Sequence, residues 1–314
     1  MSSPDLSIVI VNWNTKALLN DCLTSCSKSP NADNEEIIVV DNASDDGSVE
    51  MVKADFPNVV LIENQTNRGF AAANNQGFEV AQGRHILLLN SDTVVHGDVL
   101  AQTVRYMDEF PDIGVLGCRV LNPDGTTQPN TSRFPSLLNL IILSSGLWKI
   151  KSIPFFDRYR MQNWDRKDAR DVEIVAGCYM TVRKEAMDVV GPLDEDFYFF
   201  GEETDWCVRF KRAGWRVHCA PVGEITHLGG GSAKKLNHKR DVMLTDATIR
   251  LHRKYYGNFS AFLAWAILML FNTSRFLFWK LASFFSKSER VIDRKNHFLK
   301  VTCATPSLLG SRTK

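Results

Sequence analysis

The sequence predicts an α/β fold in which a Rossmann-like mixed β-sheet is covered by helices on both faces. Short β-branched apolar runs alternate with longer helical patterns over residues 1–118, as expected for successive βα units. Several of these runs end abruptly in amide, hydroxyl or carboxylate side chains, and open α/β sheets bind ligands at the carboxyl ends of their strands. The length of 314 residues suits one large domain with an appended segment.

Composition argues against several classes of protein. A net charge of +1 gives no reason to expect a nucleic-acid partner. The seven cysteines are odd in number and form no Cys-X-X-Cys pair, which disfavours a disulfide framework or a zinc ribbon. The N-terminus lacks a basic region, and its apolar run is too short for a signal peptide. We therefore expect reduced thiols and a location on the cytoplasmic side of the membrane.

The first two predicted strands each end in polar side chains. Leu6–Val11 runs into Asn12 and Asn14 before a helix, and Glu36–Val40 runs into the polar segment 41–48 before a second helix at 49–56. Asp41, directly after a buried strand, is suited to accept a hydrogen bond from a base or from ribose hydroxyls. An Asx-turn or helix cap is the alternative role for this carboxylate.

A third strand over Val59–Glu63 leads into an alanine- and glycine-rich helix at 67–77, whose small residues allow close approach to the sheet or to a ligand. The next buried strand, His85–Leu89, closes on Asn90, Ser91 and Asp92. Residues two apart in an extended segment point the same way, so Asn90 and Asp92 could share one cation or one sugar diphosphate. A helix cap at this position is the alternative.

The pattern is less regular after a helix at 98–110 and a strand at 113–118. Residues 121–126 predict a turn, and Arg133 beyond it is either a diphosphate ligand or an ordinary surface arginine. Residues 150–170 mix aromatic and basic side chains, and we expect them to form a mobile insertion that contacts the acceptor.

Strands near 172–176 and 179–182 and a helix at 183–190 precede an acidic cluster. Glu202, Glu203 and Asp205 follow four aromatic residues, and an apolar wall beside carboxylates raises their pKa toward that of a general base. A simple match to the dipole of a helix N-terminus is the alternative. The last strand is predicted at 215–220.

His227 is expected in a loop, because three glycines, Ser232 and Lys234 follow it. Such a loop suits closure over an anion, with Lys234 at the diphosphate. A solvated loop histidine is the alternative.

Four ordered motifs resemble those of family 2 inverting glycosyltransferases with the GT-A fold, in the rhamnosyltransferase-like branch, over about residues 5–255. The motifs are Ser-Ile-Val-Ile-Val-Asn-Trp-Asn at 7–14, Val-Val-Asp-Asn-Ala-Ser-Asp-Asp-Gly-Ser at 39–48, Asn-Arg-Gly-Phe-Ala at 67–71 and Leu-Leu-Asn-Ser-Asp at 88–92. The resemblance implies a nucleotide site made of Asn12, Asn14, Asp41, Asn42, Ser44, Asp46, Asn67, Gly69, Asn90 and Ser91.

The resemblance also implies roles for the remaining residues. The family's Asp-X-Asp metal motif has Asn90 in its first position here, which leaves Asp92, with His227 as partner, to hold Mg²⁺ or Mn²⁺. The family's Glu-Asp pair carries the catalytic base in its second member, which is Glu203 here. The longer glutamate arm keeps Glu202 and Asp205 open as alternatives.

The predicted activity is an inverting single displacement from a nucleoside diphosphate sugar to a hydroxyl of a lipid-linked or cell-surface polysaccharide. L-Rhamnose from dTDP-rhamnose is the leading donor, with UDP-galactofuranose or a UDP-hexose as alternatives. The chain has no Gly-X-Gly-X-X-Gly after its first strand and no Walker A motif, which disfavours a dehydrogenase or a P-loop enzyme. A catalytically inactive membrane scaffold is the other class left open.

The C-terminal region changes character. We predict a catalytic domain at 1–257, with a nucleotide half at 1–118 and an acceptor half at 119–257, followed by a membrane-associating tail at 258–314. The apolar pieces of 259–285 are expected to form two short interfacial helices separated at 272–275, each below the ~20 residues of a span. Residues 286–314 carry seven Lys or Arg against two acids, which suits an anionic leaflet. Packing on the catalytic domain or in a homo-oligomer is the alternative.

Overall fold

The computed structural model describes residues 4–30, 34–150, 152–229 and 237–310. The chain divides into two compact units. Unit 1 comprises residues 1–133, 160–198 and 202–232, and unit 2 comprises 134–159, 199–201 and 233–314. Segment 134–159 and the whole of the helix that follows residue 237 are thus grouped with the C-terminal helices, whereas the sequence placed the boundary at residue 257.

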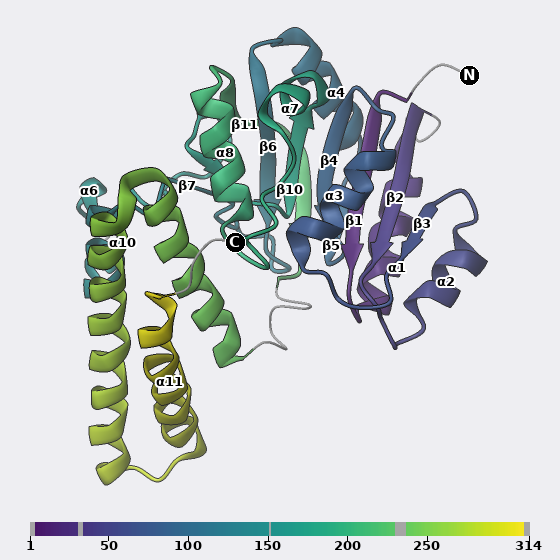
Figure 1. Ribbon diagram of the computed structural model, residues 1–314. Helices are drawn as coiled ribbons and strands as arrows, with labels where there is room; N and C mark the ends of the chain where they lie inside the picture. Colours follow the sequence, from purple (N-terminus) through teal and green to yellow (C-terminus); the bar gives the residue numbers. More distant parts are fainter. Residues whose placement is uncertain (1–3, 31–33, 151, 230–236, 311–314) are drawn as a thin grey trace. The chain divides into compact units, whose positions relative to one another are not determined.

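Unit 1 is built on a mixed sheet with the strand order β3-β2-β1-β4-β10-β6-β11-β5 (Figure 1). Strands β3, β2, β1 and β4 are parallel, and β10 runs antiparallel between β4 and β6. The bounds are β1 Leu6–Asn12, β2 Glu35–Asp41, β3 Val60–Glu63, β4 His85–Asn90, β5 Thr93–Val95, β6 Ile113–Leu121, β10 Tyr179–Arg183 and β11 Arg216–His227. Short β8 (Arg170–Asp171) pairs with β11, and β7 (Thr131–Ser132) pairs with β9 (Ile174–Val175).

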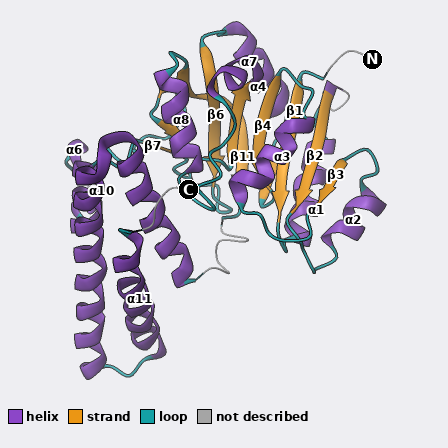
Figure 2. Ribbon diagram, in the orientation of Figure 1, coloured by secondary structure: helices purple, strands orange, loops and turns teal. Residues whose placement is uncertain are grey.

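Helices cover both faces of this sheet (Figure 2). One face packs against α1 (Lys16–Ser27), α2 (Ser48–Asp55) and α4 (Val99–Glu109). The other packs against α3 (Phe70–Val80), α7 (Lys184–Val190) and α8 (Glu202–Arg212). The predicted α/β class, with helices on both faces of a mixed sheet, is confirmed.

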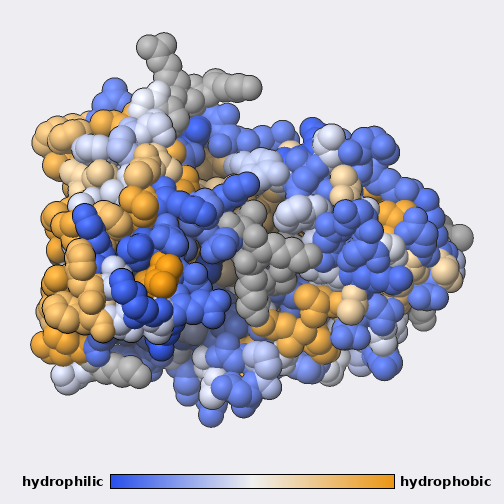
Figure 3. Space-filling model, turned by 90° about the horizontal axis from the view of Figure 1, so that it is seen from below, coloured by the Kyte–Doolittle hydropathy of each residue, from blue (hydrophilic) through white to orange (hydrophobic). Residues whose placement is uncertain are grey.

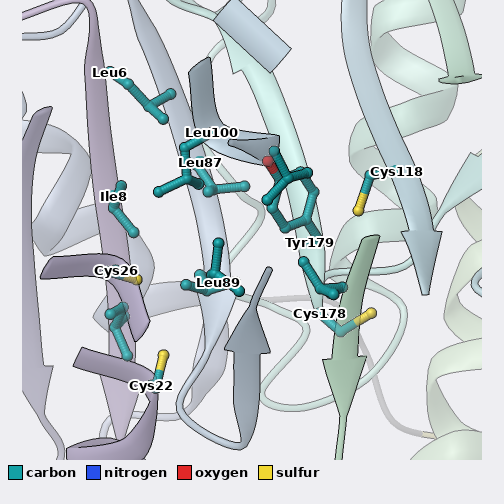
Figure 4. Packing of buried hydrophobic residues seen from close by; sticks show 14 of the residues in the cluster. Leu6, Ile8, Cys22, Cys26, Leu87, Leu89, Leu100, Cys118, Cys178 and Tyr179 are labelled. Carbon is teal, nitrogen blue, oxygen red and sulfur yellow. The ribbon is translucent and has the colours of Figure 1, made fainter. Parts of the chain in front are cut away.

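The core on the α1 side is formed by apolar side chains that β1, β4 and β10 direct toward the helices. Leu6, Leu87 and Tyr179 are buried there among side chains from α1 and α4 (Figure 4). On the opposite face α3 lies very close to the sheet, because a Cβ added at Gly77 would lie 2.4 Å from Cγ1 of Val9. The small residues of this helix therefore serve close helix–sheet packing.

Strand register brings the predicted polar residues to one edge of the sheet. Asn12 pairs with Asp41 across β1 and β2, and Val11 pairs with Asn90 across β1 and β4. His227 pairs with Thr93, because β11 extends far beyond the predicted end at residue 220 and runs antiparallel to β5. The prediction that His227 lies in a loop is therefore wrong. It is the last residue of a strand.

Unit 2 consists of α5 (Leu137–Ser145), the 3₁₀ turn η2 (Leu147–Lys149), α6 (Pro154–Asp157), α10 (His238–Phe285) and α11 (Glu289–Leu308). Gly257, with φ 80° and ψ 178°, interrupts α10 and divides it into two helices. The second of these, 258–285, continues through residues 272–275, so the predicted break between two short interfacial helices is wrong. Within this unit α11 packs along α10, and α10 also packs against α5.

Candidate active site

Side chains from the ends of β1, β2 and β4 form a hydrogen-bonded floor. Asn12 Nδ2 donates to Asp41 Oδ2 at 2.8 Å and to Ser44 Oγ at 3.1 Å, and its Oδ1 accepts from Thr15 Oγ1 at 2.6 Å. The Thr15 hydroxyl also lies 2.9 Å from the Ser91 hydroxyl. Three predicted nucleotide-binding segments are thus joined through buried polar groups that satisfy one another's hydrogen bonds.

The loops above this floor hold an uncommon backbone conformation. Asn14 and Ala43 have positive φ angles of 54° and 63°. Asn14 is fixed on both sides, because its N–H donates to Ser44 Oγ at 2.9 Å and its Oδ1 accepts from the N–H of Asp45 at 2.8 Å. Non-glycine residues in this region require support from their surroundings and are common at functional sites. Asp46 accepts from the N–H of Lys16 at 2.8 Å and so ties the second loop to the start of α1.

A second group of predicted residues surrounds the start of α3. Asn42 Nδ2 donates to the carbonyl of Gly69 at 3.1 Å, and Asn67 Oδ1 accepts from the N–H of Gly69 at 2.9 Å. Asn67 Oδ1 also accepts from the Tyr198 hydroxyl at 3.1 Å. Gly69 has φ 85°, and a Cβ there would lie 2.6 Å from the carbonyl oxygen of Tyr198, so only glycine fits.

Asp92 and His227 lie together at the end of β4 and β11. His227 Nε2 is 3.1 Å from Asp92 Oδ1 and 3.3 Å from Asn90 Nδ2. Asp92 is buried, and its main-chain carbonyl accepts from the N–H of Leu228 at 2.9 Å. The two residues are 135 positions apart in the sequence, and the antiparallel pairing of β5 with β11 brings them together.

Gln128 determines which nitrogen of His227 carries the proton. Its Nε2 donates to Asn122 Oδ1 at 2.8 Å and to the His227 carbonyl at 3.2 Å, so its Oε1 must be the atom 2.6 Å from His227 Nδ1. A carbonyl oxygen only accepts, which makes Nδ1 the protonated nitrogen. When the ring carries this single proton, Nε2 directs its lone pair toward Asn90 and Asp92.

These groups fit a divalent cation. Metal-binding histidines donate their second ring N–H to an oxygen acceptor, and Gln128 plays that part here. A carboxylate oxygen and an imidazole nitrogen then face the same point. No group of three or more His, Cys, Asp or Glu side chains in the described residues could hold a metal, so further ligands would have to come from a bound diphosphate and water.

The two glutamates at the start of α8 have different surroundings. The Glu202 side chain is 4% exposed, and its Oε2 makes no hydrogen bond to the described part of the chain. Burial raises the pKa of Glu202 well above its ordinary range, and the negative charge of Glu203 raises it further. Glu203 is only partly buried.

Asp205 is fully buried and belongs to an ion pair. Its Oδ2 accepts from Arg209 Nε at 2.8 Å one helical turn later. The Arg209 guanidinium in turn donates to the main-chain carbonyls of Val190 and Pro192, at 3.0 and 2.7 Å. This network fixes α8 to the turn that ends α7.

Cys178 is a buried cysteine whose thiol is affected by the charges of Asp92 and Glu203. It immediately precedes β10, and its carbonyl accepts from the N–H of Asn90 at 3.3 Å. Burial raises the pKa of its thiol to about 12, and the negative charges of Asp92 and Glu203 contribute to the rise. The charges of both carboxylates thus act in the same direction on the pKa of one buried thiol.

The two predicted diphosphate cations are placed differently. Arg133 is partly exposed directly after β7, and no described residue forms an ion pair with it. Lys234 lies outside the described residues.

Two side chains of the site were not predicted from the sequence. Gln128 follows a turn and faces a histidine 99 positions later, and no local pattern relates them. Thr15 bridges Asn12 and Ser91. Its position directly after a polar strand end is the available signal in the sequence.

Relatives of known name are similar to this chain over much of its length. The N-acetylglucosaminyl-diphospho-decaprenol L-rhamnosyltransferase of Mycobacterium tuberculosis is 25% identical over 204 residues, which cover 61% of this chain and 66% of that protein. The match thus spans slightly less than two thirds of that relative. A low-salt glycan biosynthesis hexosyltransferase of Haloferax volcanii is 21% identical over 227 residues, which cover 71% of this chain and 67% of that protein.

Solved structures agree on the fold. One is the mannosyltransferase PcManGT from Pyrobaculum calidifontis in complex with GDP-Man and Mn²⁺. The superposition covers 98% of this chain and 87% of that chain, with a TM-score of 0.55 and 14% sequence identity. GalNAc-T7 with UDP, GalNAc and Mn²⁺ covers 80% of this chain and 48% of its own at a TM-score of 0.57 and 17% identity. At these identities the likeness concerns the GT-A architecture.

A family model described as glycosyl transferase family 2 matches residues 7–191, which is more than half of the chain. This match includes the strand ends that hold Asn12, Asp41 and Asp92. The match, the architecture and the site geometry agree with the expected family. The chain belongs to glycosyl transferase family 2.

Proposed function

We propose that this enzyme transfers a hexose, L-rhamnose from dTDP-rhamnose as the leading choice, to a hydroxyl of a lipid-linked or cell-surface glycan with inversion at the anomeric carbon. The observation that carries the proposal is the arrangement of Asp92, His227 and Gln128 at the carboxyl ends of the strands. The name of the mycobacterial relative supports both the sugar and the lipid-linked acceptor. UDP-galactofuranose and UDP-hexoses remain the alternative donors.

In this proposal the strand ends bind the donor. The floor formed by Asn12, Asp41 and Ser44 holds the nucleoside, while Asp92 and His227 Nε2 hold Mg²⁺ or Mn²⁺ at the diphosphate. When bound, the cation neutralises charge that builds on the leaving nucleoside diphosphate. An imidazole ligand favours Mn²⁺ over the harder Mg²⁺, and both structural neighbours are described with Mn²⁺.

Glu203 is the proposed base. A base must be ionised and within reach of the acceptor hydroxyl. Glu202 meets neither condition well, because it is buried and because its raised pKa favours the protonated form over the ionised one. Asp205 is held by Arg209. In the transfer step Glu203 takes the proton of the acceptor hydroxyl. The hydroxyl oxygen attacks the anomeric carbon at the same time, and the bond between that carbon and the diphosphate oxygen breaks.

A thermal-shift panel with dTDP, UDP and GDP, each with Mn²⁺ or with chelator, tests the donor site. We expect one nucleotide to raise the Tm only when the metal is present, and the Asp92→Asn variant to lose that rise. Asp21→Asn, on the exposed surface of α1, is the matched control and keeps it. If none of the nucleotides shifts the Tm of the unmodified protein, the inactive-scaffold alternative is favoured.

The base is tested by Glu203→Gln, with the donor that the panel selects. We expect transfer to fall by roughly 10²–10⁴-fold, the usual contribution of a general base, while the nucleotide-induced Tm rise is kept. Glu185→Gln, exposed on α7, is the control. Full activity in the Glu203→Gln variant, with loss in Glu202→Gln instead, would move the role to Glu202.

For unit 2 we propose peripheral binding to the cytoplasmic leaflet of the inner membrane. In the part of the chain that the structure describes, α10 is the helix whose length and composition would permit a membrane span. Its second half exposes large apolar residues that recur at helical spacing: Phe259, Phe262, Leu270, Leu277, Leu281 and Phe284. Figure 3 shows hydrophobic surface gathered along the left edge, where Figure 1 places α10.

The neighbouring helix favours an interfacial position over a span. α11 packs along α10, with Trp265 Nε1 donating to the Thr305 carbonyl at 3.0 Å. Its first half carries Arg290, Asp293, Arg294 and Lys295. A spanning α10 would bring these charges into the hydrocarbon, which is costly, whereas an in-plane α10 leaves them at the headgroups.

A further inference from the structure

A second apolar surface in unit 2 lies on α5 and α6. Residues 134–156 contain no aspartate or glutamate. Five large apolar side chains of this segment are between 41% and 50% exposed. They are Leu138, Ile141, Ile150, Ile153 and Phe155, and we call them the α5–α6 surface. Isolated exposed apolar residues are ordinary, but such a group within one short segment indicates a contact surface.

The geometry of α5 separates this surface from the interior of the unit. Asn139, Leu140 and Ile142 are buried, and Asn139 Nδ2 donates to the Phe134 carbonyl at 2.7 Å. Leu138 and Ile141, three residues apart, share the opposite face. The outward residues are therefore apolar on a helix whose packing is already satisfied by its other side.

The segment that carries the α5–α6 surface packs against the helix proposed to bind the membrane. α5 packs against α10 within unit 2. The ring of Phe134 lies 5.4 Å from that of Tyr256, and the Pro135 carbonyl lies 2.8 Å from His252 Nε2. These contacts join the start of α5 to the part of α10 just before Gly257, beyond which the exposed apolar face of α10 begins at Phe259.

Cations accompany aromatic rings at the ends of this segment. Lys149 Nζ lies 5.8 Å from the Trp148 ring centroid, and the Arg158 guanidinium lies 5.2 Å from that of Phe155. Tryptophan rings at the bilayer–water boundary and basic side chains that reach the lipid phosphates are the usual composition of an interfacial contact.

We propose that the α5–α6 surface is a second contact of unit 2 with an anionic phospholipid bilayer. This inference rests on the proposed membrane binding of unit 2 and extends it. Ile150, Ile153 and Phe155 belong to the segment 150–170 that the sequence predicts to contact the acceptor, and they would then lie at the bilayer surface, where a lipid-linked acceptor resides. The absence of carboxylates from residue 134 to residue 156 suits a negatively charged surface.

Environment-sensitive dyes on single cysteines test the contact directly. Cys303 is the exposed native thiol among the described residues and is replaced by serine. An NBD dye is then placed through Ile141→Cys, through Leu277→Cys on α10, or through Val189→Cys, an exposed apolar site on α7 of unit 1. The full-length protein is mixed with vesicles of 30% phosphatidylglycerol in phosphatidylcholine.

We expect blue-shifted, stronger NBD emission at positions 141 and 277 and none at 189. A response at 277 without one at 141 would overturn this inference while leaving the membrane binding of α10 in place. No response at either site would overturn both. As a second measurement, Leu138→Glu with Ile141→Glu should lower the vesicle partition coefficient roughly tenfold, and Val189→Glu should leave it unchanged. Equal partitioning of the double variant contradicts the inference.

Discussion

The buried carboxyl of Glu202 gives stability a specific pH dependence. Burial holds its folded-state pKa well above the unfolded value. The contribution of Glu202 to the free energy of unfolding is fully present below the pKa that this group has in the unfolded chain. It is lost as pH rises toward the pKa of the group in the folded chain, because the unfolded chain releases a proton that the folded chain keeps. Glu202→Gln removes this loss. We expect the Tm difference between the variant and the unmodified protein to grow from pH 5 to pH 8.

The linkage slope for one proton limits this effect to about 1.4 kcal/mol per pH unit. Glu185→Gln, exposed on α7, serves as the control with no such trend. Calorimetry at several pH values measures the difference, and a constant offset across the range would show that Glu202 titrates as an ordinary glutamate.

Gln128 offers a test of the proposed metal site from a residue that does not itself face the cation. Gln128→Leu removes the acceptor at His227 Nδ1, so the proton is free to move to Nε2 and block the lone pair. We expect Mn²⁺ affinity in the presence of the nucleotide to fall about 10–100-fold, measured by electron paramagnetic resonance. Gln82→Leu, exposed before β4, is the matched control. Unchanged affinity in the Gln128→Leu variant would remove His227 from the metal site.

At the scale of elements, the turn that begins α3 leaves no room for a side chain at Gly69. Gly69 combines φ 85° with a Cβ position 2.6 Å from the Tyr198 carbonyl oxygen, whereas Gly125, with φ 80°, has open space around it. Alanine at either position bears a backbone cost of about 1–2 kcal/mol. Gly69→Ala adds the collision with Tyr198. We expect Gly69→Ala to lower the free energy of unfolding clearly more than Gly125→Ala, measured by urea denaturation, and equal losses would contradict the close approach.

The elements that the sequence predicted are those with strong local signals. The apolar runs that became β1, β2 and β4 and the small residues of α3 predicted both the fold and the polar strand ends. The length of β11 was missed, because Pro221 and Gly223 interrupt the strand pattern and the structure accommodates them with a register shift. The continuity of α10 through 272–275 was also missed. Its polar residues remain helical, and Asn272 among them is buried.

The candidate site was predicted only as far as single segments allow. Asn12, Asp41 and Asp92 were recognisable because each lies at the end of its own strand or just after it. The Gln128–His227 contact and the Asp205–Arg209 network depend on side-chain orientation and on pairings far along the chain. Burial separates the roles of Glu202 and Glu203, and burial of neighbouring polar residues has no signature in the sequence.

At the scale of the whole molecule, the division into two compact units allows two ligands to act on different parts of one chain. Donor chemistry is proposed for unit 1, and the apolar surfaces of α10, α5 and α6 belong to unit 2. Hydrogen exchange of the full-length protein, read by mass spectrometry, separates the two. We expect the selected nucleotide with Mn²⁺ to slow exchange at the ends of β1, β2 and β4 and at the start of α8, because ligands stabilise the segments that they contact.

Anionic vesicles should instead slow exchange in α5 and in residues 258–285, and the effect should weaken as salt rises, since residues 286–314 carry a net charge of +5 that salt screens. Neutral phosphatidylcholine vesicles provide the control and should protect these segments less. Protection of unit 1 by vesicles without protection of unit 2 would place the membrane contact on the catalytic unit and overturn the assignment of α10. Nucleotide protection limited to unit 2 would overturn the donor site. The two footprints thus test the proposals separately, in one experiment on the intact chain.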